Sequence, residues 1–156
     1  MIKLGVNTVL FKGYSFKEAA EAIKAAGYDG LEISAIKGMC EHLNLDNWKT
    51  QKNDIKSIME EYNLEMLSAE VASLDEERLI KSFEAGAEIG IPVINIGPGG
   101  KSEDGESLKA SLEKIAKMSE KAQEYGVVLC VKAHVGAAIY NTPTTLKAMD
   151  YIKSQN

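Results

Sequence analysis

The feature that most restricts the fold of this chain is a regular alternation of short strand-like runs and longer amphipathic segments. Each run rich in β-branched and other apolar residues is followed by a segment with helical periodicity. The predicted strands are KLGVNTVL, DGLEIS, LEMLSAEV, PVINIG and VVLCVKAH, and the predicted helices span 15–26, 46–62, 75–90, 102–125 and 143–154. This alternation predicts an α/β fold with parallel strands joined by right-handed crossovers.

Residues that start and stop helices stand at the boundaries of this repeat. Ser15–Glu18 (SFKE) is a capping-box pattern, and Asp46 and Asp75 are predicted N-caps. The last helix is predicted to start at Thr142 as N-cap, with Pro143 in its first turn. The glycines predicted to end helices before the next strand are Gly27, Gly90 and Gly126.

The number of β/α units is smaller than a closed barrel needs. Successive units begin roughly 26 to 34 residues apart, which is the spacing of a TIM barrel, where about 250 residues give eight units. A chain of 156 residues has room for about five such units. We therefore predict one domain over residues 1–156, a partial or half-barrel of parallel β/α repeats. Right-handed crossovers place every helix on one face of the sheet, so the other face needs cover from self-association, from further chain or from tighter curling.

Alternation along the predicted strands separates an aliphatic face from a polar one. The aliphatic positions suit the layer beneath the helices. The third strand is ambiguous, because Met66, Ser68 and Glu70 alternate with Leu67, Ala69 and Val71. The polar positions toward the strand ends are Asn7, Glu32, Glu70, Asn95, Lys132 and His134. Ligands of parallel α/β folds bind at the carboxyl ends of the strands, so this polar set predicts a site there.

A purely structural interpretation of two of these residues is also open. Glu32 and Lys132 can form an internal ion pair that serves packing alone, because buried charges need a partner whatever their purpose. Ionisable residues gathered on one rim from several strands are harder to explain by packing, and they favour a functional site.

Charge, cysteine content and hydropathy exclude several classes of function. Lys and Arg number 18 against 23 Asp and Glu, a net charge of -5, and the basic residues are spread through the predicted helices. Nucleic acid is therefore not an expected partner. Cys40 and Cys130 lie far apart without metal-ligand spacing, which fits reduced cytoplasmic thiols. Because no apolar run approaches the roughly 20 residues of a membrane helix, and the N-terminus lacks a signal sequence, we expect a cytoplasmic protein with no membrane partner.

Five segments of the chain together have a familiar pattern: MIKLGVNTVLF, AIKAAGYDGLEIS, HLNLDN, AGAEIGIPVINIGPGG and EYGVVLCVKAHVGAAIYNTPTTLKAM. They resemble the N-terminal half of the xylose isomerase-like TIM-barrel family of sugar phosphate isomerases and epimerases. The resemblance implies a (β/α)8 barrel with a divalent metal (Mn, Mg or Zn) held by carboxylates and histidines at the carboxyl rim. It also implies hydroxy-carbonyl sugars or sugar phosphates as substrates, isomerised by proton transfer beside the carbonyl.

The chain departs from the family pattern at the metal ligands. Lys132 stands where the resemblance implies a metal-binding Glu on the fifth strand, and an ammonium repels a cation. Gly97–Gly99 (GPG) replaces the family's frequent HPG. The remaining family ligands come from strands six to eight, beyond the fifth unit. In contrast, Glu32 and His42 match positions that the family often uses near its pocket.

Three residues are the candidate catalytic groups. His134 is predicted to ligate a metal or to act as an acid or base. Lys132 is predicted to hold a phosphate or carboxylate or to polarise a carbonyl, and Glu32 is predicted to be a general base or the partner that keeps Lys132 ionised. The predicted substrate-binding residues are Asn7, His42, Glu70 and Asn95.

Two functions remain open at this point. The first is a sugar isomerase or epimerase, or an inactive fragment of one, with a polar pocket at the strand ends. The second is a catalytically silent half-barrel whose bare sheet face binds a second copy or another partner. A homodimer is expected in both cases, because an uncovered sheet face exceeds the apolar surface that monomers usually expose.

Overall fold

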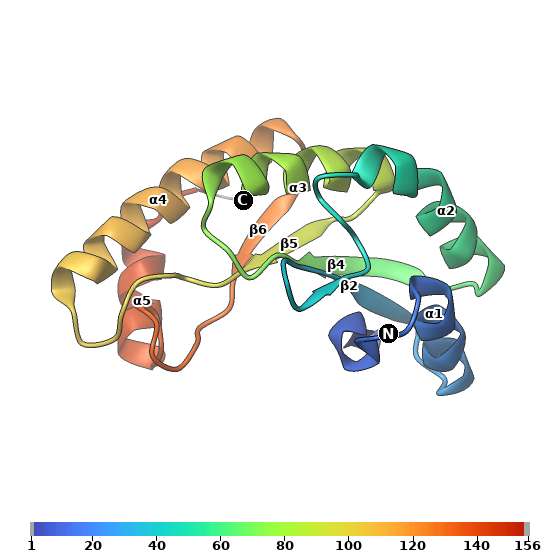
Figure 1. Ribbon diagram of the computed structural model, residues 1–156. Helices are drawn as coiled ribbons and strands as arrows, with labels where there is room; N and C mark the ends of the chain where they lie inside the picture. The colour runs from blue at the N-terminus through green and yellow to red at the C-terminus, as the bar shows by residue number, and fades with distance from the viewer. Residues whose placement is uncertain (1, 155–156) are drawn as a thin grey trace.

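The computed structural model describes residues 2–154 and shows a curved sheet of parallel strands with helices along its outer side (Figure 1). The first half contains β1 (Gly5–Asn7), the 3-10 helix η1 (Thr8–Phe11), α1 (Phe16–Ala25), β2 (Gly30–Ile36), β3 (Cys40–Glu41) and α2 (Trp48–Glu61). The second half contains β4 (Glu65–Glu70), α3 (Glu76–Ile89), β5 (Val93–Ile96), α4 (Gly105–Glu124), β6 (Val128–Val131) and α5 (Thr142–Tyr151). The predicted β/α repeat is confirmed in all five units.

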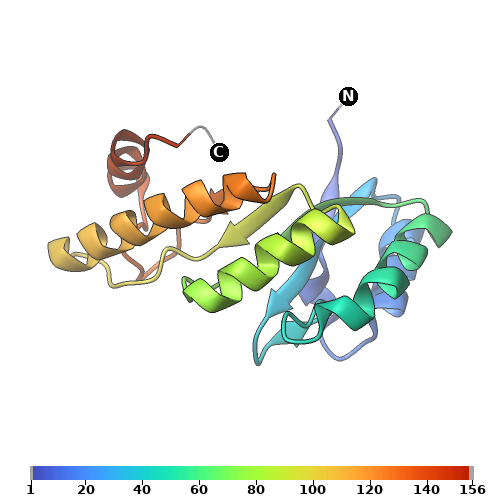
Figure 2. The ribbon, with the colours of Figure 1, turned by 90° about the horizontal axis from the view of Figure 1, so that it is seen from above.

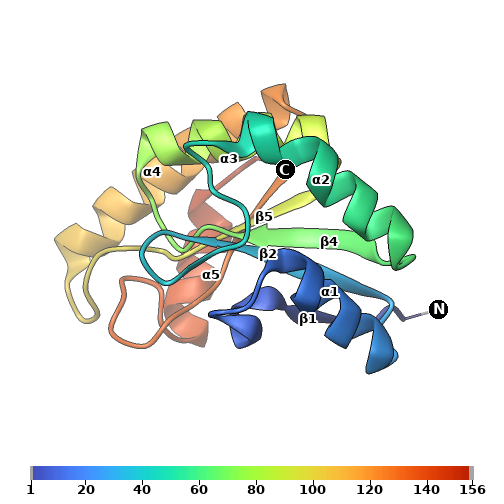
Figure 3. The ribbon, with the colours of Figure 1, turned by 45° about the vertical axis from the view of Figure 1, so that its right-hand side comes forward.

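The parallel strands lie in the order β1-β2-β4-β5-β6, and the short β3 pairs with β2 in the antiparallel sense. The helices follow one another as an arch around the outer side of this sheet, with α2, α3 and α4 across its middle (Figures 1 and 2). Figure 3 shows α1 beside β1 at one end of the arch. Within residues 2–154 no helix covers the inner side, as the right-handed crossovers predict for a partial barrel.

The hydrophobic core lies between the sheet and the arch of helices. Leu31 and Ile33 of β2 and Ile94 and Ile96 of β5 are at most 1% exposed. They belong to one continuous apolar cluster with residues of α1 to α4, such as Phe83. Burial of each such side chain stabilises the fold by about 1.5–3 kcal/mol. The predicted aliphatic face of these two strands is therefore confirmed.

A bulge in β4 explains why the sequence of this strand is ambiguous. Leu31 of β2 pairs with Met66, but the next residue, Glu32, pairs with Ser68, so Leu67 is an extra residue. Paired residues of parallel strands face the same side, which turns Met66 toward the helices and Ser68 toward the inner side. Glu70 follows on the inner side, because it pairs with Ser34. No single alternation describes both halves of this strand.

The extra residue Leu67 packs over two glycines on the inner side. A Cβ atom on Gly5 or Gly30 would overlap the Leu67 side chain, and on Gly30 it would also overlap the carbonyl oxygen of Glu65. Gly30 is therefore required by the close approach of backbone, whereas a side chain at Gly5 would only push the end of the Leu67 side chain aside. Leu67 thus lies over the first residues of β1 and β2 on the inner side of the sheet.

We expect Gly30→Ala to lower the free energy of unfolding by about 1–3 kcal/mol, since the added methyl group meets backbone that has no room to move. Urea denaturation followed by circular dichroism measures this loss. Gly105→Ala is the matched control, because a Cβ at this first residue of α4 meets nothing within 4 Å. Equal midpoints for the two variants would contradict the close packing around Gly30.

Several predicted element ends need correction. Asp75 and Ser15 cap α3 and α1 as predicted, whereas Asp46 is not an N-cap, because α2 begins after Asn47 and the Asp46 carboxylate binds lysines instead. The N-cap of α5 is Asn141, not Thr142, and its side chain accepts a hydrogen bond from the Thr144 N–H.

β1 and β6 end at least three residues earlier than predicted, and one strand was not predicted. β1 ends at Asn7, whose side chain accepts a hydrogen bond from Val9 N–H and starts the 3-10 turn. β6 ends at Val131, so Lys132 and His134 lie in the following loop. The β3 hairpin was not predicted from the sequence. Among residues 2–154, none of the helices has the length and apolar character of a membrane span.

Candidate functional site

Six polar side chains meet on the inner side of the sheet, toward the carboxyl ends of the five parallel strands. They form the carboxylate cluster: Asn7 from β1, Glu32 from β2, Ser68 and Glu70 from β4, Asn95 from β5 and Lys132 directly after β6. The strands are short and in sequential order, so residues near the same height on each strand lie side by side. The structure thus brings together five of the seven residues predicted for the site.

Asn7 joins the two carboxylates of the cluster. Its Nδ2 donates a hydrogen bond to Glu32 Oε2 and another to Glu70 Oε2, both at 2.5 Å. Its Oδ1 accepts from the N–H of Val9 at 2.8 Å, and this contact orients the amide so that its two N–H groups face the carboxylates. One side chain of β1 therefore fixes the positions of two acidic groups on two other strands.

Glu32 is surrounded by hydrogen-bond donors. Besides Asn7, it accepts from Ser68 Oγ at 2.9 Å and from Asn95 Nδ2, both at its Oε1. All three of these partners are hydrogen-bond donors, which match the acceptor oxygens of a carboxylate. Ser68 was not among the predicted site residues, because its inward direction depends on the bulge in β4.

Lys132 pairs with Glu70 and not with Glu32, which corrects the predicted ion pair. The Lys132 Nζ donates to Glu70 Oε1, the oxygen that Asn7 leaves free. The Glu70 side chain is 7% exposed and the Lys132 side chain is 52% exposed. The ammonium therefore approaches a buried carboxylate from the open side of the cluster, and Glu70 is its one hydrogen-bond acceptor within residues 2–154. An ammonium carries three N–H groups, so two of them are left for a ligand.

The two histidines lie apart from this hydrogen-bond network. His134 is exposed in the loop after β6, with its Nδ1 2.9 Å from the carbonyl oxygen of Val135. His42 is 9% exposed, its Nε2 lies 3.0 Å from the carbonyl oxygen of Tyr14, and its ring packs against Phe16 at 6.1 Å. In the described part of the chain neither imidazole forms a hydrogen bond with the carboxylate cluster.

Residues 20–156 match the family model of the xylose isomerase-like TIM barrel. The chain belongs to the xylose isomerase-like TIM barrel family. The predicted resemblance is thereby confirmed, and the five β/α units of the structure are a partial form of the family's barrel. No curated protein sequence matches the chain.

Solved structures agree on the fold. A xylose isomerase-like TIM barrel protein from Mycobacterium smegmatis in complex with magnesium has a TM-score of 0.80 at 10% identity, covering 98% of this chain and 62% of that one. The probable 3-DHS dehydratase AsbF of petrobactin synthesis from Bacillus anthracis has a TM-score of 0.79 at 14% identity, with 99% and 61% covered. D-Allulose 3-epimerase from Methylomonas sp. has a TM-score of 0.70 at 18% identity, with 99% and 60% covered. The chain thus spans about three fifths of the length of these proteins.

The carboxylate cluster of this xylose isomerase-like chain does not fit the divalent metal that the resemblance implies. Glu32 and Glu70 supply hard oxygen ligands, but the third charged group beside them is the Lys132 ammonium, a cation itself. Within residues 2–154 no group of three His, Cys, Asp or Glu side chains is arranged to hold a metal ion. The predicted metal ligand His134 forms no hydrogen bond or ion pair with either carboxylate in the described residues.

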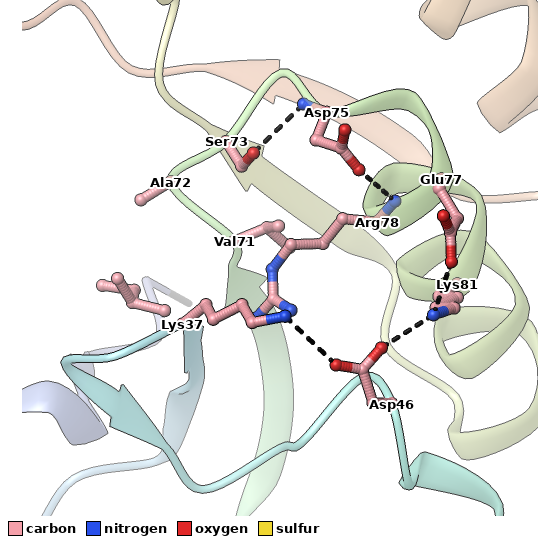
Figure 4. Close-up of a pocket in the computed structure, with 10 residues that line it drawn as sticks. Lys37, Asp46, Val71, Ala72, Ser73, Asp75, Glu77, Arg78 and Lys81 are labelled. Carbon is pink, nitrogen blue, oxygen red and sulfur yellow. Dashed lines mark hydrogen bonds and ion pairs between the residues drawn. The ribbon is translucent and has the colours of Figure 1, made fainter.

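A second polar feature lies at the rim, between the loops that follow β2 and β4 (Figure 4). It is a cavity of about 500 Å³, and none of the carboxylate cluster lines it. Arg78 lies at its wall, 8% exposed, and donates from Nη2 to the carbonyl oxygen of Ala35, while its buried Nε is unpaired within the described residues. The lining residues are Ile36, Lys37, Asp46, Val71, Ala72, Ser73, Asp75, Glu77, Arg78 and Lys81.

Ion pairs across this cavity hold the loop before α2 against α3. Asp46 lies 2.7 Å from Lys81 Nζ and 3.4 Å from Lys37 Nζ, and Lys81 also contacts Glu77 at 2.9 Å. The pKa of the Asp46 carboxyl is lowered, chiefly by the hydrogen bond from Lys81 and then by the one from Lys37. The hydrogen bond to Asp46 is also the main cause that raises the pKa of Lys81. Lys37 and Lys81 each have an acidic neighbour, so these ion pairs connect the loop before α2 to α3.

We expect Asp46→Asn to lower stability at pH 7, and we expect this difference from the wild type to disappear in acid. A carboxyl with a lowered pKa in the folded state stabilises the protein above its unfolded pKa of about 3.9, and this stabilisation is lost as the pH falls through the lowered folded value. Urea midpoints measured from pH 7 to pH 2 test this. Asp54→Asn on α2, an exposed residue, is the control that should match the wild type throughout. If the urea midpoints of Asp46→Asn and the wild type differ by the same amount at all pH values, the ion pairs of Asp46 do not stabilise the fold.

Proposed function

We propose that this chain carries part of a sugar isomerase or epimerase site, which acts on a small hydroxy-carbonyl sugar or sugar phosphate by proton transfer. The observation that supports this most is the carboxylate cluster, in which polar side chains from β1, β2, β4, β5 and the residue directly after β6 meet toward the carboxyl ends of the strands. The name of the Methylomonas neighbour, an epimerase of D-allulose, points to the same substrate class. The chain covers about three fifths of the length of the matched structures, and we propose that it is active by itself.

Lys132 is the proposed electrophile of the reaction. Two of its N–H groups are left for ligand oxygens, and the ammonium lies on the open side of the cluster. A sugar carbonyl or phosphate oxygen placed there receives a charge-assisted hydrogen bond. When the proton on the neighbouring carbon leaves, its electron pair moves to the carbonyl oxygen, and Lys132 stabilises the resulting enediolate.

Glu32 is the proposed base that removes this proton and returns it. It gives up one of its three hydrogen bonds, such as the one from Ser68, when it accepts the proton. Asn7 and Asn95 hold Glu32 in place, and Glu70 orients Lys132. These three residues are the proposed substrate-binding and positioning groups.

The two histidines receive different proposals. His134 remains a proposed acid or base at the rim, because it is exposed and its Nε2 has no hydrogen-bond partner in the described residues. For His42 we propose a packing role in place of substrate binding, because its two ring nitrogens already face Cys40 and the Tyr14 carbonyl oxygen.

The experiment that tests the proposed function follows deuterium uptake from D₂O at the carbon beside the carbonyl, by NMR, over a panel of ketohexoses and their phosphates. Exchange above the buffer rate for at least one sugar is the expected result. A panel without exchange, combined with no saturation transfer from protein to any sugar, would remove the enzyme proposal.

A second function, a half-barrel that binds a second copy of itself, is favoured by the two open edges of the sheet. Neither β1 nor β6 pairs on its outer edge within residues 2–154. Exposed apolar side chains gather at both ends of the arch: Ile2, Leu4 and Leu10 around β1, and Val128, Val135, Leu146, Met149 and Tyr151 on β6 and the segment that follows it. We propose a homodimer that covers these residues, with or without catalysis.

The two cysteines support a proposed cytoplasmic location. Cys40 is buried and Cys130 is exposed, and neither forms a disulfide within the described chain. An exposed free thiol persists in a reducing compartment.

A further inference from the structure

The carboxylate cluster contains its own positive charge. Glu32 and Glu70 lie on either side of the Asn7 amide, each at 2.5 Å from the same nitrogen. Two carboxylates held this close, one of them almost fully buried, require a cation nearby. Lys132 provides it at Glu70 Oε1.

We propose that Lys132 takes the place of a metal ion in this cluster, so that the site excludes divalent cations, and that exchanging this one residue for a carboxylate converts the cluster into a metal site. This inference does not rest on the proposed sugar chemistry, because metal binding is measured without any substrate.

The exclusion follows from where the ammonium lies. A divalent ion such as Mn²⁺ or Mg²⁺ binds carboxylate oxygens directly at about 2.0–2.2 Å. Glu70 Oε1 is already occupied by the Lys132 Nζ, and Glu32 Oε1 by donors from Ser68 and Asn95. An ion at the other two oxygens, which both accept from the Asn7 amide, would compete with this donor and would lie next to the positive charge of Lys132.

The conversion follows from the same geometry. The Lys132 side chain is half exposed, so a shorter Glu side chain fits at this position without displacing core residues. This substitution would change the summed formal charge of Glu32, Glu70 and the side chain at position 132 from −1 to −3. Three carboxylates from β2, β4 and the end of β6, with water, form the all-oxygen ligand set that Mn²⁺ and Mg²⁺ prefer.

The test is a titration with Mn²⁺ followed by the electron paramagnetic resonance signal of the free ion. We expect the wild type to show no saturable site below about 1 mM, and Lys132→Glu to show one site with a dissociation constant at least tenfold lower than that limit. Lys109→Glu, which makes the same charge change at an exposed position of α4, is the control and should behave as the wild type.

Every outcome of this titration decides the inference. Saturable Mn²⁺ binding by the wild type below about 1 mM overturns it, and so does a folded Lys132→Glu protein with no gain in affinity. Lys132→Gln removes the ammonium with a smaller charge change, and it replaces Lys132→Glu if that variant does not fold. We expect Lys132→Gln to bind Mn²⁺ more tightly than the wild type, and no gain overturns the inference as well.

Discussion

Glu32→Gln is expected to slow proton exchange at the sugar carbon by about 10²–10⁴-fold, the contribution typical of a general base. The amide keeps the size of the side chain and can still accept from Ser68 and Asn95, but it cannot take up a proton. Sugar affinity, measured by saturation-transfer NMR, should change much less, because Lys132 and the asparagines remain. The exchange rate and the affinity thus separate a base from a residue that only binds.

Glu113→Gln on α4 is the matched control for this variant, since Glu113 is exposed and lies on the outer side of the molecule. Its exchange rate should equal that of the wild type. If Glu32→Gln exchanges within threefold of the wild type while remaining folded, Glu32 is not the base, and the cluster is then left with a binding role.

Replacing Leu146 and Met149 together by Lys is expected to convert the proposed dimer to a monomer. The two residues are 55% and 68% exposed and lie three apart on one face of α5. If both are buried between copies, each contributes about 1.5–3 kcal/mol, so the dimer dissociation constant rises by about 10²-fold or more. Sedimentation velocity over a concentration series measures this change.

Lys147→Ala, on α5 between these two residues, is the control and should leave the association unchanged. A wild-type protein that sediments as a monomer at about 100 µM, well above the range of a specific dimer, would contradict the dimer itself. A double variant that still sediments as a dimer would place the contact elsewhere, for example at Leu4 and Leu10.

Much of the fold follows directly from local sequence. Leu31, Ile33, Ile94 and Ile96 alternate with small or polar residues, and this alternation predicts both the strands and the side that faces the helices. Helix starts at Ser15 and Asp75 are equally local, because capping depends on residues within one turn. The predicted N-cap at Asp46 was wrong, because its carboxylate pairs with Lys37, outside the helix, and with Lys81 of α3.

The sequence predicts most residues of the carboxylate cluster but not the hydrogen bonds between them. Parity along the strands brings Asn7, Glu32, Asn95 and Lys132 to one side, as the sequence indicates. The pairing register of β4 decides whether Lys132 pairs with Glu32 or with Glu70. This register contains a bulge that the residue types of the strand do not predict. The burial of His42 was equally hidden, since it results from a hairpin that folds back on Tyr14.

The irregular register of β4 changes which of its residues face the helices and which face the inner side of the sheet. Before Leu67 it is Met66 that faces the helices, and after Leu67 it is Ala69 that does so, while Ser68 and Glu70 face the inner side. A shift of phase by one residue lets Met66 and Glu70 face opposite sides although their spacing would otherwise align them. We therefore expect substitutions of Met66 or Ala69 to change stability, and substitutions of Ser68 or Glu70 to change the proposed site.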